Sequence, residues 1–357
     1  MLIEKYLEVV VKKRGSDLHI SAGLPPVVRI DGQLQRMDVP ALKPEEVELL
    51  LFPMLNKEQR RKLEQDWELD FSYGVQGLSR FRVNIYKDRG NYAAAFRVIA
   101  SQVPSFKELG LSETVRKIAE KPRGLVLVTG PTGSGKSTTL AAMINYINET
   151  RSEHILTIED PIEFIHPSKR SIIHQIELGQ DTRSFANALK AALREDPDII
   201  LVGEMRDLDT IRLALTAAET GHLVFGTLHT SSASQTIDRI IDVFPEGQQQ
   251  QVRVQLSNSL VAVFSQTLLP LLQADGITKS GRVMAQEVML VIPAIANLIR
   301  EAKAAQIYST MQTNSGFGMQ TLEMSLRDLY LRKKITLEDA LARSSRPDEF
   351  KRGLQNS

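Results

Sequence analysis

Hydrophobic positions in the middle of the chain follow two alternating patterns. Apolar residues at helical spacing predict helices at 138–146, 182–194 and 209–220. Apolar runs typical of buried strands occupy residues 124–129, 154–158, 172–175, 198–202 and 222–228. Because strands and helices alternate, we expect an α/β domain with a parallel sheet covered by helices on both faces.

A different pattern precedes this region, and residues 1 to about 100 resemble a small α+β domain. Its first helix is predicted by an apolar stripe at Leu2, Ile3, Tyr6, Val9 and Val10. A second helix opens near Pro44, and Asp31-Gly32 is a strong hairpin turn signal. Strands are predicted at 18–20, 27–30, 33–36, 69–73, 81–85 and 92–99.

From Ala233 onward the pattern is mostly helical, and the last helices are predicted at 321–330 and 336–342. A hinge is expected at 102–105, and a helix at 112–120 leads into the middle region. We therefore divide the chain into four parts. They are an N-terminal domain at 1–104, a linker at 105–112, a nucleotide-binding domain at 113–290 and a helical C-terminal extension at 291–357.

Composition narrows the classes of function. The 357 residues include 44 Lys plus Arg against 43 Asp plus Glu, so net charge gives no support for a nucleic-acid partner. The chain has no cysteine, which excludes disulfides and cysteine-ligated zinc and fits a reducing compartment. No apolar stretch approaches the ~18 residues of a transmembrane segment. We expect a cytoplasmic protein.

A phosphate-binding loop follows the first buried strand of the middle region. The pattern G-x-x-x-x-G-K-[ST] wraps backbone N–H groups around phosphates at the positive end of the next helix. Lys136 would reach the β- and γ-phosphates, and Ser137 would hold Mg²⁺. The alternative is a glycine-rich turn that binds nothing. The loop residues are Gly130, Pro131, Thr132, Gly133, Ser134, Gly135, Lys136, Ser137 and Thr138.

Acidic residues follow two of the predicted buried strands, one residue after 198–202 and three after 154–158. Glu204 lies just beyond 198–202, at the sheet edge where ligands bind in such folds, and is the best candidate to order Mg²⁺ and the attacking water. An incidental acid at a strand end is the alternative. Glu159, Asp160 and Glu163 follow 154–158, and their mutual repulsion would be relieved by Mg²⁺. A solvated loop could carry the same residues.

Histidine and arginine residues supply further candidates. His222 and His229 flank the strand 223–228 at its two ends, and His229 is better placed to sense a γ-phosphate. A packed structural histidine is the alternative for His222. Arg82 faces away from the apolar side of its strand, and Arg97 lies on the neighbouring strand. A solvated basic face and an arginine delivered to a neighbouring subunit's phosphates would give the same periodicity.

Taken together, these blocks resemble the secretion-ATPase superfamily, most closely the PilT-type retraction ATPases of type IV pili. The resemblance covers essentially the whole chain, and its last block looks like the family's AIRNLIRE motif, with Ala296 where the motif has arginine. The matching blocks are 15–19 (GSDLH), 130–139 (GPTGSGKSTT), 157–164 (TIEDPIEF), 200–207 (ILVGEMRD), 220–230 (TGHLVFGTLHT) and 294–301 (AIANLIRE).

The resemblance implies a fold, a site and partners. It implies a homohexameric ring whose subunits join a PAS-like N-terminal domain to a RecA-like ATPase domain, with ATP between the two domains. It assigns Lys136, Ser137 and Thr138 to phosphate and Mg²⁺, Glu204 to an atypical Walker B acid, and Glu163 to the acidic box. The paired arginines that neutralise γ-phosphate match Arg82 and Arg97, and the histidine pair matches His222 and His229.

The implied activity is ATP hydrolysis that drives pilus retraction. The implied partners are an inner-membrane platform protein and a second retraction ATPase, which would dock the ring at the inner face of the membrane. An assembly or secretion ATPase is the first alternative, but those usually carry a four-cysteine zinc element that this chain cannot form. The second alternative is an accessory ring subunit that hydrolyses little. In the family, the AIRNLIRE motif is linked to retraction rather than to hydrolysis, so the departure at Ala296 concerns coupling to the pilus and not the ATPase activity.

Overall fold

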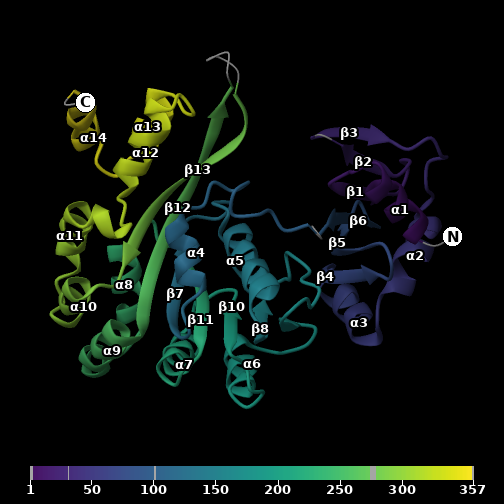
Figure 1. Cartoon of the computed structure of the whole chain (residues 1–357). Helices are drawn as coiled ribbons and strands as arrows, with labels where there is room; N and C mark the ends of the chain where they lie inside the picture. Colours follow the sequence, from purple (N-terminus) through teal and green to yellow (C-terminus); the bar gives the residue numbers. More distant parts are fainter. Residues whose placement is uncertain (1–2, 31, 100–101, 274–278, 356–357) are drawn as a thin grey trace. The chain divides into compact units, whose positions relative to one another are not determined.

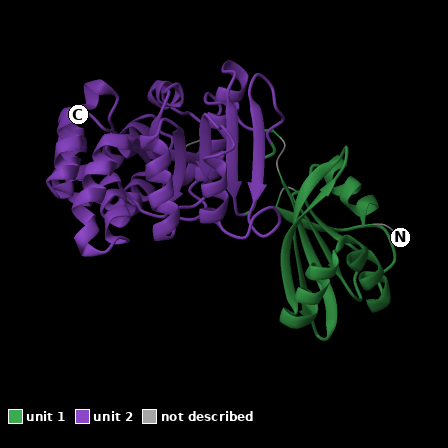
Figure 2. Cartoon of the chain, turned by 90° about the horizontal axis from the view of Figure 1, so that it is seen from below, with its two compact units in different colours: residues 1–102, 161–165 green, residues 103–160, 166–357 purple. Residues whose placement is uncertain are grey.

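Residues 3–30, 32–99, 102–273 and 279–355 are those that the computed structural model of this chain describes. The chain divides into two units, which Figure 2 distinguishes by colour. Unit 1 contains Met1–Gln102 and Pro161–Ile165, and unit 2 contains Val103–Asp160 and His166–Ser357. The four predicted domain limits stay predictions, and none of them places 161–165 with the N-terminal residues.

Unit 1 is built on a six-stranded antiparallel sheet in the order β3-β2-β1-β6-β5-β4 (Figure 1). Its helices are α1 (Glu4–Lys12), α2 (Pro44–Leu51), the 3₁₀ turn η1 (Phe52–Met54) and α3 (Lys57–Asp66). Its strands are β1 (Asp17–Ser21), β2 (Val27–Ile30), β3 (Gln33–Arg36), β4 (Glu68–Val75), β5 (Ser79–Asp88) and β6 (Asn91–Val98).

Most elements of unit 1 were predictable from their periodicity. The hairpin of β2 and β3 has the predicted bounds, and Gly32 adopts a φ of 81°, as such a turn requires. Leu2 and Asp31, named in the predicted stripe and turn, lie outside the described residues. Helix α3 was not predicted, because its polar sequence has little apolar periodicity. Its signal is a capping box, in which Asn56 and Gln59 bond each other's backbone.

Unit 2 contains a seven-stranded sheet in the order β13-β12-β7-β11-β10-β8-β9. All neighbours are parallel except β12 and β13, so the predicted α/β class is confirmed. Its helices up to β13 are α4 (Glu113–Ala119), α5 (Lys136–Thr150), α6 (Phe185–Ala192), α7 (Leu208–Glu219), α8 (Ala233–Asp242) and α9 (Glu246–Ser259). Its strands are β7 (Gly124–Thr129), β8 (His154–Glu159), β9 (Ile172–Glu177), β10 (Ile199–Val202), β11 (Leu223–Leu228), β12 (Leu260–Leu272) and β13 (Lys279–Leu290).

The expectation of mostly helical structure from Ala233 onward is wrong for β12 and β13. These strands pair with each other over most of their length, and β12 also pairs with β7. A continuous apolar run does not by itself distinguish a buried strand from a buried helix. Pro270 adds to the ambiguity, and it lies where the register of the pair shifts, which is where a strand tolerates proline.

The C-terminal residues form short helices, including the two that were predicted. They pack partly on the ends of β12 and β13, where Leu269 and Ala285 share a cluster with Leu326, Ile335 and Phe350. No helix in the described ranges combines the length and the apolar character needed to cross a membrane. The helices are α10 (Pro293–Arg300), η2 (Ala304–Gln306), α11 (Ile307–Thr313), η3 (Ser315–Phe317), α12 (Leu322–Leu331), α13 (Leu337–Arg343) and α14 (Pro347–Gln355).

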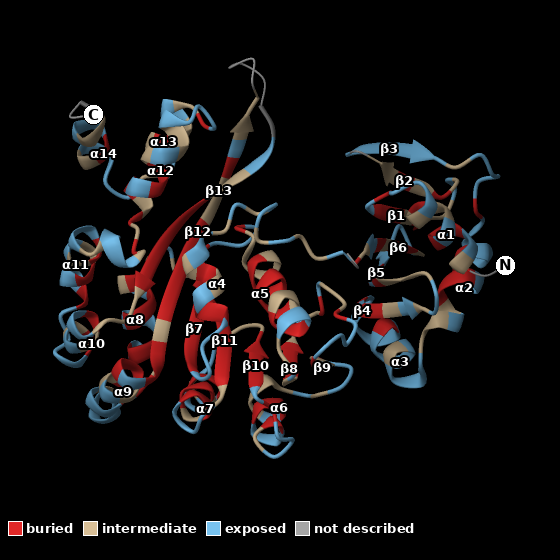
Figure 3. Cartoon of the chain, viewed as in Figure 1, coloured by how far each residue is buried: buried red, intermediate tan, exposed pale blue. Residues whose placement is uncertain are grey.

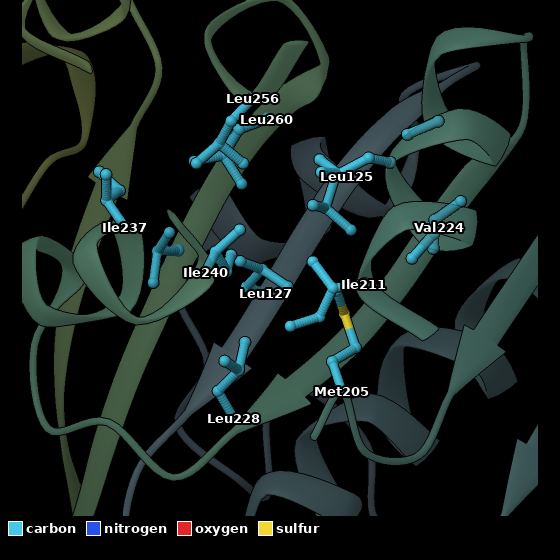
Figure 4. Packing of buried hydrophobic residues seen from close by; sticks show 14 of the residues in the cluster. Leu125, Leu127, Met205, Ile211, Val224, Leu228, Ile237, Ile240, Leu256 and Leu260 are labelled. Carbon is cyan, nitrogen blue, oxygen red and sulfur yellow. The ribbon is translucent and has the colours of Figure 1, made fainter. Parts of the chain in front are cut away.

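The central strands β7, β8, β10 and β11 of the unit 2 sheet are buried on both faces, as their red colour in Figure 3 shows. Alternate residues of β7 pack into different clusters. Leu125 and Leu127 face the cluster that contains Ile211 of α7 and Ile240 of α8 (Figure 4). Val126 and Val128 belong to a second cluster, which contains residues of α4 and α5. A parallel sheet buried on both faces explains the uninterrupted apolar runs. It also brings the carboxyl ends of β7, β8, β10 and β11 to one edge.

Candidate functional site

The predicted phosphate loop connects β7 to α5 and has a backbone that only glycine adopts easily. Gly130, Gly133 and Gly135 have φ values of 141°, 77° and 89°, all in the range that side chains disfavour. Gly135 is also the N-cap of the 15-residue helix α5. The unpaired N–H groups of a helix N-terminus favour an anion at this position.

The side chains of the loop also suit a phosphate group. Lys136 Nζ donates hydrogen bonds to the carbonyl oxygens of Gly130 and Pro131, at 2.9 and 3.2 Å, so its charge lies against the loop backbone. The Ser134 hydroxyl is buried and has no hydrogen-bond partner among the described residues. A cationic group and glycine backbone in one loop at a helix N-terminus fit the phosphates of a nucleotide.

A second polar group lies at the carboxyl ends of β10 and β11. Glu204 Oε1 is 2.9 Å from His229 Nε2 and also accepts a hydrogen bond from Arg206 Nε. Burial raises the pKa of Glu204, but Arg206 and His229 outweigh it, so the pKa is lowered and the carboxylate is ionised. The three side chains line a pocket of about 440 Å³ together with Met205, Leu228, Thr230 and Arg239.

The strand register explains why Glu204 and His229 meet. β10 and β11 are parallel neighbours, and Val202 lies opposite Gly226. Beyond them, Thr227 Oγ1 donates to the Gly203 carbonyl at 2.5 Å, and Met205 N donates to the Thr227 carbonyl at 3.0 Å. These bonds hold the turn after β10 against the last residues of β11, so the two side chains project from a fixed backbone.

The acidic block at residues 157–164 is divided between the two units, since 157–160 belong to unit 2 and 161–164 to unit 1. Glu159 ends β8, where its Oε1 accepts bonds from Thr157 Oγ1 at 2.7 Å and Gln175 Nε2 at 3.1 Å. Glu163 is exposed and belongs to the segment Pro161–Ile165 of unit 1. No described group of three or more His, Cys, Asp or Glu side chains forms a metal-binding cluster. The roles of Glu163 in catalysis and of Ser137 and Glu204 toward Mg²⁺ stay predictions.

His222 is not brought together with Glu204. It precedes β11, at the opposite sheet edge from His229, where it lines a pocket of about 340 Å³ with Arg151, Glu153 and Asp198. Its Nδ1 is 2.9 Å from the carbonyl oxygen of Ala217, which belongs to the last turn of α7. Within one chain, His229 follows β11 at the sheet edge where the phosphate loop begins, and His222 does not; the roles of both stay predictions.

Arg82 and Arg97 lie directly opposite each other on β5 and β6 of unit 1. Arg82 bonds Asp70, Arg97 Nε bonds Asp17 Oδ1 at 2.9 Å, and their side chains remain 49% and 73% exposed. Two like charges opposite each other destabilise a sheet unless counter-charges are near. Asp70 and Asp17 supply these counter-charges, and the role of the two arginines toward a nucleotide stays a prediction.

Gln266 is a contact of the phosphate loop that the sequence did not reveal. Its amide, on β12, bonds Ser134 and Thr139. It belongs to no motif, and the available signal was weak, because it is one polar residue within an otherwise mostly apolar run. Recognising it required β12 to be placed beside β7.

Together, this fold and site define a P-loop nucleotide-hydrolysing protein with a RecA-like arrangement of strands. A family model described as "Type II/IV secretion system protein" matches residues 1–340, so the chain belongs to this family and is an ATPase.

The relatives of the chain match it over most of its length. The type IV pilus retraction ATPase PilT of Pseudomonas aeruginosa is 53% identical over 350 residues, which is 98% of this chain and 100% of the relative. A twitching motility protein of Neisseria gonorrhoeae is 55% identical and covers 91% of this chain and 86% of its own length. A crystal structure of the pilus retraction motor PilT with bound ADP has a TM-score of 0.90, 50% identity and 99% coverage of both chains.

These findings confirm three predictions. The resemblance to PilT-type ATPases is confirmed, as are the α/β fold of an N-terminal domain followed by an ATPase domain and the class of enzyme. ATP is supported as the nucleotide because the matched structure contains ADP. Individual site residues and domain limits are not tested by these matches.

Proposed function

We propose that this chain is the subunit of a homohexameric ATP-driven motor that retracts type IV pili and so supports twitching motility. The observation that carries the proposal is the match over nearly the full length of both chains to a pilus retraction ATPase. The same superfamily includes assembly ATPases, but the absence of cysteine excludes the four-cysteine zinc element of that group.

In this proposal, each residue of the site has a chemical role. Lys136 binds the β- and γ-phosphates, and the backbone of 130–135 wraps them. Glu204 holds the attacking water, because its carboxylate is ionised and half-enclosed. His229 keeps that carboxylate in place from the neighbouring strand. Glu163 acts as a second acid of the site.

Mg²⁺ is part of the proposal, and Ser137 and Glu204 would hold it, Glu204 through water. Ser137 follows the loop lysine at the start of α5, the position whose hydroxyl binds Mg²⁺ in other phosphate loops. The ion would neutralise charge on the phosphates. Hydroxyl and carboxylate oxygens are ligands that this hard cation prefers.

Arg82 and Arg97 are proposed to act on the nucleotide of a neighbouring subunit. Mixed rings test this role. An R82A subunit keeps an intact loop, and a K136A subunit keeps intact arginines, so a 1:1 mixture restores about one interface in four if assembly is random. We expect each variant alone to be nearly inactive and the mixture to regain up to about a quarter of wild-type phosphate release.

The control for the mixed rings is R29A. Arg29 also pairs with Asp17, at 3.6 Å, but lies on β2, away from Arg82. Its loss should leave ATP turnover within about twofold of wild type, the size expected for a surface ion pair. A mixture of R82A and K136A with no more activity than its components would contradict action across subunits.

A cellular experiment tests retraction itself. We propose that the ring is cytoplasmic, docks on an inner-membrane platform protein and works with a second retraction ATPase. Deletion of the gene should abolish twitching while surface pili remain abundant, and wild-type protein but not K136A should restore motility. Loss of surface pili on deletion would instead indicate an assembly ATPase.

A further inference from the structure

Gln266 lies in the interior of unit 2, against the phosphate loop, although it is 132 residues from Ser134 in the sequence. It is 3% exposed and follows Ser265, whose hydroxyl is 2.8 Å from that of Thr129 at the end of β7. An added Cβ on Gly130 would lie 2.2 Å from the Gln266 carbonyl oxygen, which shows how closely β12 approaches the loop. A buried amide side chain in such a place must find partners.

The amide of Gln266 has one partner on each side. Its Nε2 donates to the carbonyl oxygen of Ser134 at 3.0 Å, and its Oε1 accepts from Thr139 Oγ1 at 3.1 Å. A carbonyl can only accept a hydrogen bond, so the Ser134 bond fixes which end of the amide is the nitrogen. Gln266 thus joins the loop backbone to the first turns of α5.

The bond to Ser134 also orients the next N–H group. The peptide between Ser134 and Gly135 is planar, and in a trans peptide the C=O and N–H groups point in opposite directions. Because the Ser134 carbonyl points toward β12, the Gly135 N–H points away from β12. Gly135, with a φ of 89°, permits the chain to turn into α5 from this peptide orientation.

We propose that Gln266 is a positioning residue for nucleotide binding, which holds the Ser134–Gly135 peptide so that its N–H group faces the phosphates. It does so through Ser134 and Thr139 and without touching the nucleotide. This inference rests on the proposed role of residues 130–138 in binding ATP. It extends the site to a strand that carries none of the phosphate-loop motif.

Three variants separate the two bonds. Q266L removes both, Q266E keeps the acceptor for Thr139 but replaces the donor to Ser134 with an oxygen, and T139V removes only the Thr139 bond. Loss of a buried partner should weaken ADP binding about tenfold in Q266L and Q266E, and less in T139V. The KM for ATP should rise by a similar factor, with a smaller change in kcat.

Gln286 provides a matched control. It lies directly opposite Gln266 on β13, is 6% exposed and has a side-chain nitrogen with no partner among the described residues. Q286L therefore removes a buried glutamine of the same size from the neighbouring strand, and the hydrogen bonds of Gln286 among the described residues go to Ser325 and Gln320 rather than to the loop. Its affinity for ADP should equal that of wild type, whatever its effect on thermal stability.

The experiment is a titration of each purified full-length protein with ADP, alongside a thermal midpoint measured without nucleotide. The inference is supported if Q266E and Q266L lose affinity and Q286L does not, at comparable midpoints. It is overturned if folded Q266E binds ADP as tightly as wild type, or if Q286L loses as much affinity as Q266L. Failure of the wild type itself to bind ADP would instead overturn the proposed nucleotide site.

Discussion

Two pairs of polar residues, one at each edge of the unit 2 sheet, differ in what their side chains bond. At the amino edge, Asp198 and His222 bond the backbone: Asp198 accepts from His154 N at 2.8 Å, and His222 Nδ1 lies 2.9 Å from the Ala217 carbonyl oxygen. At the carboxyl edge, Glu204 and His229 bond each other beside a pocket.

This difference separates structural from chemical residues within single sequence blocks. His222 and His229 belong to one block and each lines a pocket, but only His229 lies within hydrogen-bonding distance of a carboxylate, that of Glu204. A side chain that is hydrogen-bonded to backbone groups stabilises the fold. A side chain that faces a pocket and bonds another side chain there is a better candidate to bind a ligand. The two edges therefore predict different consequences for similar substitutions.

The largest expected effect compares the two acids that flank β10. E204Q should lower ATP turnover at least ~100-fold, because the amide keeps the shape of the side chain but loses the charge that is proposed to hold water and Mg²⁺. D198N keeps an acceptor for His154 N and should remain within about twofold of wild type. Phosphate release under saturating ATP measures both. Similar losses in the two variants would contradict the distinction between the edges.

A smaller effect concerns the fold rather than turnover. H222A removes the bond to Ala217 and should destabilise the protein by about 1 kcal/mol, or roughly 2–4 °C in thermal midpoint. H229A, whose side chain is 46% exposed, should leave the midpoint nearly unchanged while lowering turnover. Thermal denaturation without nucleotide checks the first effect. Equal midpoints for the two variants would show that His222 does not support the α7 turn.

A further predicted difference, again in stability rather than turnover, is a pH dependence near the carboxyl edge. Burial raises the pKa of Glu287 to about 7, with Glu323 adding to the shift and the N–H groups of Ala233 and Leu322 and the charge of Arg346 opposing it. Because the folded pKa lies above the ordinary value of 4.5, the folded state binds more protons between the two. Stability should therefore fall as pH rises from about 4.5 to about 7.

The variant E287Q removes this titration while keeping an acceptor for Ala233 N, which the wild-type carboxylate bonds at 2.7 Å. We expect E287Q to exceed wild type in stability by about 1–3 kcal/mol at pH 8 and the gap to close toward pH 5. Denaturant unfolding at several pH values measures it. A gap that does not depend on pH would show that Glu287 does not titrate in this range.

Much of unit 2 could be predicted because its signals are local. A buried strand, a glycine pattern and a helix predicted the loop that connects β7 to α5, and the position of Glu204 followed from the end of a later apolar run. The contact of Glu204 with His229 was not predictable, since it depends on which strands are neighbours. Periodicity shows that a side chain lies at a strand end, but not which second strand ends beside it.

The missed features share a different cause. β12 and β13 lack alternation because the sheet is buried on both faces, so length and register, rather than periodicity, distinguish them from helices. Gln266 was missed with them, because its role depends on that pairing. For the arginines, the sequence indicated their face, and only the register of β5 and β6 shows that Arg82 and Arg97 lie opposite each other.

The placement of β12 beside β7 also has a consequence for biosynthesis. The phosphate loop emerges from the ribosome long before its support, since 132 residues separate Ser134 from Gln266. At the usual translation rate of ~5–20 residues per second, synthesis of the 132 residues between the loop and Gln266 takes roughly 7–26 s. A nascent chain should therefore reach its full affinity for nucleotide only after synthesis has passed β12.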